Sequence, residues 1–289
     1  MKNLLRLTRP VHLLLAALTY LLGTSIADYL GKTVQPDAFW LGLLGVLLAQ
    51  TSMSLLAEVF RLDTEPLQED ETRKERQSLR NHTLYVSVGS LAAMALIVYL
   101  LNQLSPLSPQ AFLFLLVSLL FILVYSIPPF RFVNRGFGEF ILAAHLAYVI
   151  PSLAFVLQAG EAHRFLALTI PLTFLGFAYF IALDFPSFAA DRKYGRVTFL
   201  TRLGWERVVP LHHIFIVFAY IFLALTPAFG LSFSLIWPAF LTLPFALFQV
   251  YQLRNIALGA PVNWRLLSTT AFAVFGLTVY FLTMAFWLR

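Results

Sequence analysis

The chain is organised around the stretch Asp184-Phe-Pro-Ser-Phe-Ala-Ala-Asp191-Arg-Lys-Tyr-Gly-Arg-Val-Thr-Phe-Leu-Thr-Arg-Leu-Gly204, which follows a long apolar run at residues 165–183. An α-helix turns by about 100° per residue, so Asp191 would lie beneath Asp184 on the same helix face, about 10 Å along the axis. Charged side chains at membrane depth are costly and usually mark a functional site. The stretch therefore predicts a paired-carboxylate site at the end of a membrane helix.

The composition is that of an integral membrane protein. Of the 289 residues, 60% are hydrophobic and 12% are charged, with a mean hydropathy of +0.80, whereas a soluble domain carries about 25% charged residues. The absence of cysteine excludes disulfides, thiol nucleophiles and cysteine–metal sites. The net charge of +6 is explained by basic loops on one side of a membrane and indicates no nucleic-acid partner.

Nine apolar segments are each close to the roughly 20 residues that a helix needs to cross a bilayer. They cover residues 11–27, 38–59, 83–102, 110–126, 137–157, 165–183, 210–229, 232–251 and 266–288. With a cytoplasmic N-terminus, only Lys32, Arg164 and Arg289 of the 20 lysines and arginines fall on the outer side. This bias predicts a multi-pass protein, at the plasma membrane in a bacterium, whose N-terminus is cytoplasmic.

The long polar connections, residues 61–82 and 184–207, fall on the predicted cytoplasmic side, and the outer connections are short. The site is therefore expected at the cytoplasmic face. These two connections follow the second and sixth spans, four helices apart and in the same direction. Such spacing suggests a parallel repeat of four plus four helices with a ninth added, within one domain that covers residues 1–289.

A second pair of carboxylates repeats the seven-residue spacing of the first. Glu58 and Glu65 follow the second span, with Arg61 between them, and face the same side of the membrane as the opening pair. Four converging carboxylates could hold Mg²⁺, which prefers oxygen ligands and keeps sites for substrate phosphates. The alternative is that these acids are solvated charges at helix ends.

Basic residues cluster beside both acidic pairs. Arg192, Lys193 and Arg196 directly follow Asp191, and Arg131 and Arg135 lie in the connection after the fourth span. The fork of an arginine side chain matches the oxygens of a phosphate group, so these residues would suit a diphosphate. The alternative for any single one of them is the ordinary excess of positive charge on the cytoplasmic side.

Several motifs together resemble the UbiA superfamily of intramembrane aromatic prenyltransferases, over nearly the whole chain. They are Arg6-Leu-Thr-Arg9-Pro10, the acidic motif after the second span, Tyr125-Ser-Ile-Pro-Pro-Phe-Arg131 with Gly138-Glu139, and Asp184 to Gly195 with Thr198 and Arg202-Leu203-Gly204. The last motif is the strongest match. Each motif alone is a weak signal, and their combination is specific.

The resemblance implies an all-α fold of nine transmembrane helices around a central cavity that opens into the bilayer. It also implies a prenyltransferase that uses Mg²⁺ to bind a polyprenyl diphosphate from the lipid and transfers the prenyl group to an aromatic acceptor. A quinone precursor, such as the naphthoate of menaquinone synthesis, is the expected acceptor. The expected metal ligands are Glu58, Asp63, Glu65, Asp184 and Asp191, of which Glu58, Asp184 and Asp191 are also expected to be catalytic.

The same resemblance assigns the diphosphate to Arg61, Arg131, Arg135, Arg192 and Lys193. Departing diphosphate would leave an allylic cation, which the acceptor attacks. Metal and basic side chains would stabilise the charge that develops on the leaving group.

The first acidic motif departs from the family pattern Asn-Asp-x-x-Asp-x-x-x-Asp. Here the matching residues are Ala57, Glu58, Arg61 and Glu65. Arg61 could replace one metal ion and bind phosphate directly, or Asp63 could become a ligand in a shifted register. Alternatively, catalysis is lost and the protein binds isoprenoids without transferring them.

Two further positions depart from the family. Ser187 stands where the second motif usually has its middle aspartate, and Asn134 stands where the loop after the fourth span often has a lysine. Each change removes a metal or phosphate contact that the family would supply.

A transporter or lipid-binding protein is the rival from another class, because nine spans with buried charge would also suit it. A transport path needs polar groups from one face to the other, whereas the acids here gather on one side, which favours a one-sided site. No Gly-x-x-x-Gly motif is evident, so the sequence supports no statement on oligomeric state.

Overall fold

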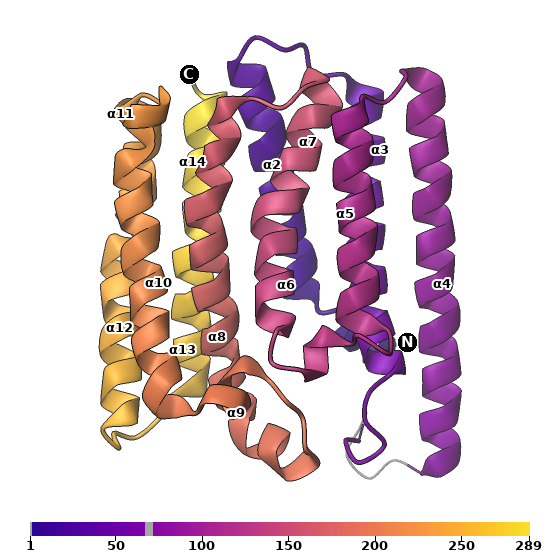
Figure 1. Ribbon diagram of the computed structural model, residues 1–289, viewed down its shortest axis with the longest axis vertical. Coiled ribbons are helices and arrows are strands. Elements are labelled where there is room, and N and C mark those ends of the chain that lie inside the picture. The colour runs from indigo at the N-terminus through magenta and orange to yellow at the C-terminus, as the bar shows by residue number, and fades with distance from the viewer. Residues whose placement is uncertain (1, 67–71) are drawn as a thin grey trace.

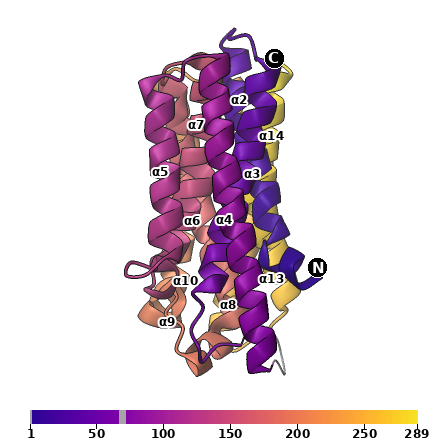
Figure 2. The same cartoon turned by 90° about the vertical axis from the view of Figure 1, so that its right-hand side faces the viewer.

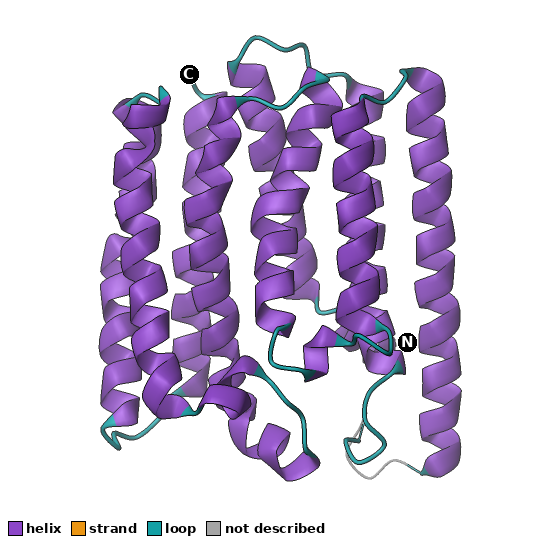
Figure 3. Ribbon diagram, viewed as in Figure 1, coloured by secondary structure: helices purple, strands orange, loops and turns teal. Residues whose placement is uncertain are grey.

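The computed structural model describes residues 2–66 and 72–289, and every regular element in these ranges is a helix (Figures 1 and 3). Nine helical runs in this described part are long and apolar enough to cross a membrane. The two ends of the chain lie at opposite ends of the bundle (Figure 1), as an odd number of crossings requires. The prediction of an all-α protein with nine spans is confirmed.

Five of the spans contain short 3₁₀ or π segments, labelled η, so one span can carry more than one label. In chain order the elements are α1 (Lys2–Leu7), α2 (Pro10–Tyr29), α3 (Pro36–Val59), α4 (Arg73–Leu104), α5 (Pro109–Ser126), η1 (Phe132–Asn134), α6 (Gly138–Ala144), η2 (His145–Val149), α7 (Ile150–Ala159), η3 (Arg164–Leu168), α8 (Thr169–Tyr194), α9 (Phe199–Leu203), α10 (Trp205–Leu225), η4 (Thr226–Phe229), α11 (Phe233–Ile236), η5 (Trp237–Thr242), α12 (Leu243–Ala257), α13 (Trp264–Phe272), η6 (Ala273–Leu277) and α14 (Thr278–Trp287).

The third span begins at Arg73, ten residues before the predicted start at residue 83. Thr72 caps the helix: its side chain accepts a hydrogen bond from the backbone N–H of Glu75, and the Glu75 carboxylate accepts one from the backbone N–H of Thr72. This reciprocal capping satisfies two of the free N–H groups at a helix start. The polar residues that follow Thr72 are therefore helical, and the predicted long loop is shorter.

The sixth span ends at Tyr194 rather than at residue 183, because helix α8 continues through Pro186. Gly195 then stops it with a left-handed backbone, φ 74°, which glycine adopts without steric cost. Asp184 and Asp191 consequently lie on one continuous helix, and the geometry expected from their seven-residue spacing applies. The seventh span also starts earlier than predicted, at Trp205.

The spans form an inner and an outer group. Between 56% and 78% of the apolar segment is buried in the first, second, fifth, sixth and ninth spans, against 28% to 39% in the other four. Figure 2 shows α4 and α5 on the outside of the bundle, facing the viewer. The inner helices α2, α3, α6, α8 and α13 are the ones that reach the candidate site described below.

The inner helices are held by close backbone packing and by a buried polar triad. A Cβ atom on Gly23 of α2 would lie 2.0 Å from the carbonyl oxygen of Pro151 on α7, so only glycine allows these two helices to approach so closely. Beside them, His145 is hydrogen-bonded to Ser118 at 2.9 Å and to Gln50 at 3.2 Å, which links α5, η2 and α3. These contacts tie the inner helices together around the site.

Candidate active site

A cavity of about 860 Å³ lies at the end of the bundle where α2 begins and α8 ends. Its outer part carries the ionisable residues Arg9, Glu139, Asp184 and Arg196. Most of the remaining lining is apolar or aromatic and includes His12, Leu142, Tyr179, Phe180, Leu183 and Phe272, while Arg265, Ser268 and Thr269 line it from α13. The cavity thus has a charged end beside an apolar body.

A small polar pocket adjoins the cavity and shares Arg9 and Arg196 with it. Its other lining residues include Glu58, Arg61 and Glu65, from the end of α3 and the segment after it, and Arg131 and Asn134, from the connection after α5. The structure therefore brings the first acidic motif and the basic loop together in this pocket, beside Arg196 from the connection after α8.

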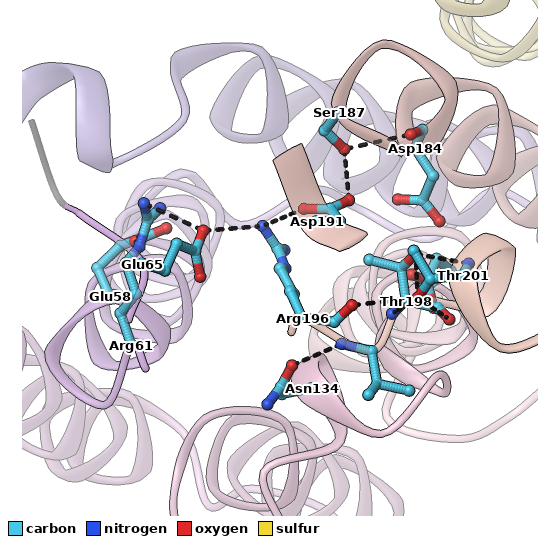
Figure 4. Close-up of polar contacts among 12 residues, drawn as sticks. Glu58, Arg61, Glu65, Asn134, Asp184, Ser187, Asp191, Arg196, Thr198 and Thr201 are labelled. Carbon is cyan, nitrogen blue, oxygen red and sulfur yellow. Dashed lines mark hydrogen bonds and ion pairs between the residues drawn. The ribbon is translucent and has the colours of Figure 1, made fainter. Parts of the chain in front are cut away.

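Arg61 holds the first acidic pair together. Its Nε donates to Glu58 Oε2 at 2.6 Å, and its Nη1 lies 3.2 Å from Glu65 Oε1 (Figure 4). Glu58 is only 4% exposed, so its charge requires such a partner. The Arg61 guanidinium therefore lies between two carboxylates. The family pattern would have an acid at this position, and a metal ion would lie between the acids.

Two further arginines complete the neutralisation of this pair. Arg9 Nη2 donates to Glu58 Oε1 at 3.1 Å, and Arg196 Nη1 lies 3.7 Å from Glu65 Oε1. Burial disfavours the charged form of Arg9, but neighbouring Tyr125 and Glu58 outweigh it, so the pKa of Arg9 is raised above its ordinary value. Each acid of the first motif is thus already engaged by at least two guanidinium groups.

The second acidic pair is less completely partnered. Asp191 is 4% exposed, and its Oδ2 accepts a hydrogen bond from the Ser187 hydroxyl at 2.7 Å, while its Oδ1 lies 3.8 Å from Arg196 Nη1. Ser187 therefore orients the neighbouring acid in this chain. By contrast, Asp184 Oδ2 is buried with no hydrogen-bond partner (Figure 4).

Arg131 supplies an unused donor to the small polar pocket. Its Nε is buried without a partner, and burial lowers the pKa of its guanidinium although the Glu65 carboxylate opposes the change. In the described part of the chain, the non-glycine residues with a left-handed backbone are Arg9, φ 54°, and Arg131, φ 41°. Such strained conformations concentrate at functional sites, and here both arginines line the same pocket.

Asn134 joins the two loops that close the site. Its Oδ1 accepts a hydrogen bond from the backbone N–H of Val197 at 2.8 Å, and the N–H of Gly136 donates to the Val197 carbonyl at 2.8 Å. Arg202 adds a bond to the Arg135 carbonyl at 3.0 Å. The asparagine that replaces a family lysine is thus a structural link between the connection after α5 and the connection after α8.

Two arginines on α4 clamp the segment after α3. Arg80 donates to the carbonyls of Val59 and Arg61, at 2.9 and 3.2 Å. Arg76, one turn away, donates to the carbonyls of Leu62, Asp63 and Glu65 at 2.7 to 3.0 Å. The last carbonyls of a helix lack intrahelical partners, so these bonds fix a backbone that would otherwise be free. Sequence reasoning missed both residues.

Replacing Arg80 by Gln is expected to loosen residues 60–66 and to lower the affinity for an isoprenyl diphosphate several-fold, because the backbone that carries Arg61 and Glu65 loses its anchors. Removing a charged donor costs about 1.5–3 kcal/mol locally. Amide hydrogen exchange of residues 60–66 measures the loosening. Arg73→Gln, at the exposed start of the same helix, is the matched control; faster exchange in both variants, or in neither, would contradict the clamp.

The remaining predicted residues lie away from the cavity walls. Asp63 has a side chain that is 88% exposed and is paired with Arg80 at 3.0 Å. Arg135 is exposed and donates to the Pro129 carbonyl at 2.6 Å. Arg192 and Lys193 are exposed and lie over the rings of their neighbours Phe188 and Tyr194. The structure brings none of these four into the cavity.

Arg9 and Glu139 are site residues to which the sequence analysis gave no role, although both belong to motifs quoted there. Glu139 lies in the first turn of the fifth span, is 7% exposed and lines the cavity. A signal was present for each: Arg9 directly precedes Pro10 at the start of a span, and Glu139 is an acid in the first turn of an apolar helix. Charges at membrane depth usually have a function.

Comparison with known proteins gives the fold first. A UbiA homologue from Archaeoglobus fulgidus, solved with GPP and Mg²⁺, aligns with a TM-score of 0.67 at 18% identity, covering 99% of this chain and 100% of the other. A digeranylgeranylglyceryl phosphate synthase aligns with a TM-score of 0.68 at 15% identity, covering 100% of this chain and 99% of the other. A UbiA homologue from Aeropyrum pernix K1, in its apo form, aligns with a TM-score of 0.52 at 11% identity, covering 95% of this chain and 96% of the other.

No curated protein matches the sequence at a significant level. The sequence pattern of the UbiA prenyltransferase family, however, matches residues 19–268, which is most of the chain and includes both acidic motifs and the loops that close the cavity. The resemblance seen in the motifs is confirmed, and the chain belongs to the UbiA prenyltransferase family.

Proposed function

We propose that the protein transfers a prenyl group from an isoprenyl diphosphate to an aromatic acceptor within the membrane, with Mg²⁺ as cofactor. The observation that carries the proposal is the cavity itself, in which a charged end adjoins an apolar, aromatic body. Those two parts match the two parts of a prenyl diphosphate. The family of the chain and the Mg²⁺ and GPP in the A. fulgidus homologue support the same assignment.

The diphosphate would bind at the charged end, where Arg9, Arg131 and Arg196 converge from three parts of the chain. Guanidinium groups bind phosphate oxygens through paired hydrogen bonds. Because acids hold Arg9 and Arg196 before substrate arrives, little reorganisation of these two groups is needed when negative charge develops on the leaving group. Arg61 would contribute mainly by holding Glu58 and Glu65, since most of its donors are already engaged.

The carboxylates fit Mg²⁺ on the α8 side of the site. Among the described residues, no three His, Asp or Glu side chains are arranged to hold a metal ion by themselves. Mg²⁺ commonly uses one or two carboxylates together with water and substrate phosphates. Asp184, with its unpartnered oxygen, and Asp191 suit this role better than Glu58 and Glu65, which guanidinium groups already neutralise. When bound, Mg²⁺ would stabilise negative charge on the departing diphosphate.

The prenyl chain would extend along the apolar walls toward lipid. Tyr179, Phe180 and Phe272 line this part of the cavity, and their ring faces are suited to a nearby allylic cation. The same walls exclude water, which would otherwise capture the cation. By the positive-inside rule, we place this end of the bundle, with the N-terminus, in the cytoplasm.

The acceptor would enter beside α13, whose residues Arg265, Ser268 and Thr269 form the polar part of the opposite wall. An aromatic acid such as a naphthoate precursor of menaquinone would stack on the aromatic walls and place its carboxylate near Arg265. Arg265→Gln is then expected to raise the KM for a carboxylated acceptor about tenfold or more, since a hydrogen bond to a charged group contributes about 1.5–3 kcal/mol. An unchanged KM, or an equal rise for the diphosphate, would contradict this placement.

The proposal is tested by diphosphate release from purified protein. Geranyl to longer diphosphates are supplied with and without Mg²⁺, and with a panel of quinone-precursor acids and, as a second acceptor class, a glyceryl phosphate lipid. Release that requires Mg²⁺ and an aromatic acceptor supports the proposed function. Release that requires the lipid instead assigns a different acceptor class and overturns the aromatic one.

Binding of isoprenoids without transfer is the second candidate. It is favoured by one observation, the neutralisation of the first acidic motif by Arg9, Arg61 and Arg196. Saturable binding of the diphosphate without release for any acceptor, at any Mg²⁺ concentration, would select this candidate.

A further inference from the structure

Glu139 is a buried acid that the family's two acidic motifs do not include. It lies in the first turn of α6, and its Oε1 accepts a hydrogen bond from the backbone N–H of Phe199 at 3.1 Å. This bond fixes the carboxylate relative to α9. Its Oε2 is buried, has no hydrogen-bond partner and belongs to a side chain that lines the main cavity. A buried carboxylate oxygen without a partner is unfavourable and calls for a ligand.

Asp184, on α8, is the second unpartnered acid of the same cavity. Both residues line the same cavity, and their carboxyl groups are close enough to interact through their charges. Asp184 Oδ2 and Glu139 Oε2 are the carboxylate oxygens that are buried without a partner in the described part of the chain. Two neighbouring carboxylates in a low-dielectric site cannot both carry a charge unless a cation lies between them.

The nearby guanidinium groups are already engaged elsewhere. Arg9 is bound to Glu58, and Arg196 lies between Glu65 and Asp191. The first acidic motif therefore has its cations, and the pair on α6 and α8 has none of its own. The wall that carries this pair also faces the space proposed for the diphosphate.

We propose that Glu139 and Asp184 together bind a divalent cation of the size of Mg²⁺, so that Glu139, from outside both acidic motifs, supplies a metal ligand. This inference rests on the proposed function, which supplies Mg²⁺ as the cation, and it deepens that function by naming a further ligand. Water and substrate phosphate oxygens complete the coordination, as is usual for Mg²⁺. The metal site would thus lie between α6 and α8 rather than beside Glu58 and Glu65, where Arg61 already supplies positive charge.

The experiment measures binding of Mn²⁺, as a spectroscopic substitute for Mg²⁺, by counting free Mn²⁺ with electron paramagnetic resonance in the full-length protein. Glu139→Gln and Asp184→Asn are each expected to raise the Kd for Mn²⁺ by at least about tenfold. Loss of a group that only supports a metal ligand already weakens metal binding on this scale. Glu139→Gln keeps an oxygen acceptor for the Phe199 N–H, so the fold is expected to survive. Asp63→Asn, which changes an exposed acid at the same end of the protein, is the matched control.

Three results would overturn the inference. One is wild-type affinity in Glu139→Gln while Asp184→Asn is weakened. Another is a loss of affinity in Glu65→Gln instead, which would place the cation beside the first motif. The third is wild-type protein that binds no more Mn²⁺ than the Glu139→Gln/Asp184→Asn double variant, which would mean that the pair shares a proton.

Diphosphate release by the same proteins separates this inference from the proposed function. Mn²⁺ binding that depends on Glu139 in a protein that releases no diphosphate would retain the cation site and reject the transferase. If diphosphate release depends on Mg²⁺ but Glu139→Gln does not change the affinity for Mn²⁺, the transferase is retained and this cation site is rejected.

Discussion

Asp191→Asn is expected to lower the Mg²⁺-dependent rate of diphosphate release about 100- to 1,000-fold, the scale seen when one preorganised charge-stabilising group is removed from an active site. The variant keeps the shape of the side chain and an oxygen that accepts the Ser187 hydrogen bond. It loses the negative charge that faces Arg196 and that would bind metal. The measurement is the rate at saturating substrate across a Mg²⁺ titration.

The fold of Asp191→Asn is expected to be retained, because Arg196 keeps Glu65 as an ionic partner. An unchanged thermal unfolding midpoint, together with the lost rate, would show that the effect is on chemistry. Asp63→Asn is the control: it removes an equal charge from an exposed position paired with Arg80 and should leave the rate unchanged. A full rate in Asp191→Asn would remove this residue from the metal assignment.

The number of spans was predictable because a helix of about 20 apolar residues is long and apolar enough to cross the bilayer, and such segments are evident in a sequence. The ends of the helices were less predictable. Residues 73–82 are polar and were read as loop, yet the capping pair Thr72 and Glu75 begins a helix there. The helix through Pro186 was likewise cut short in the prediction, because polar residues beyond a span resemble a connection.

The same seven-residue spacing has two different structural meanings in this chain. Asp184 and Asp191 lie on one helix, so the helical period places them on one face. Glu58 and Glu65 do not, because α3 ends at Val59 and the period no longer applies beyond it. Arg61 brings the latter pair together through ion pairs instead. The helical geometry that the spacing predicts therefore holds for the pair on α8 and fails for the pair at the end of α3.

Contacts between distant parts of the chain could not be read from one sequence. The pairing of Arg9 with Glu58 spans 49 residues, and Arg196 meets Glu65 only because the segments after α3 and α8 lie together. Thr64 shows this proximity directly, since its hydroxyl donates to the Tyr194 carbonyl at 2.9 Å. Spacing along the chain carries no information on such neighbours, so the charge balance of the site required the structure.

Arg61→Asp is expected to make the stability of the protein depend on Mg²⁺. Without metal, the substitution leaves Glu58 and Glu65 buried beside a third acid, and breaking a buried ion pair in this way costs about 3–5 kcal/mol. Three carboxylates from one segment then form an oxygen-ligand site, and a cation at 100 times its Kd would restore about 2.7 kcal/mol. The measurement is the thermal unfolding midpoint with chelator and with saturating Mg²⁺.

Arg61→Gln is the matched control for this experiment. It also removes the cation that Glu58 and Glu65 share, so it should be destabilised in chelator, but it adds no ligand and should gain from Mg²⁺ only what the wild type gains. The comparison is therefore between the Mg²⁺-induced shifts of the three proteins, because any cation site elsewhere contributes equally to all of them. A larger shift in Arg61→Asp alone would mean that the guanidinium occupies the place of a metal ion. Equal shifts in all three would mean that Arg61 is an ordinary partner of two buried acids, and the metal requirement of this chain would then rest on the α6–α8 side alone.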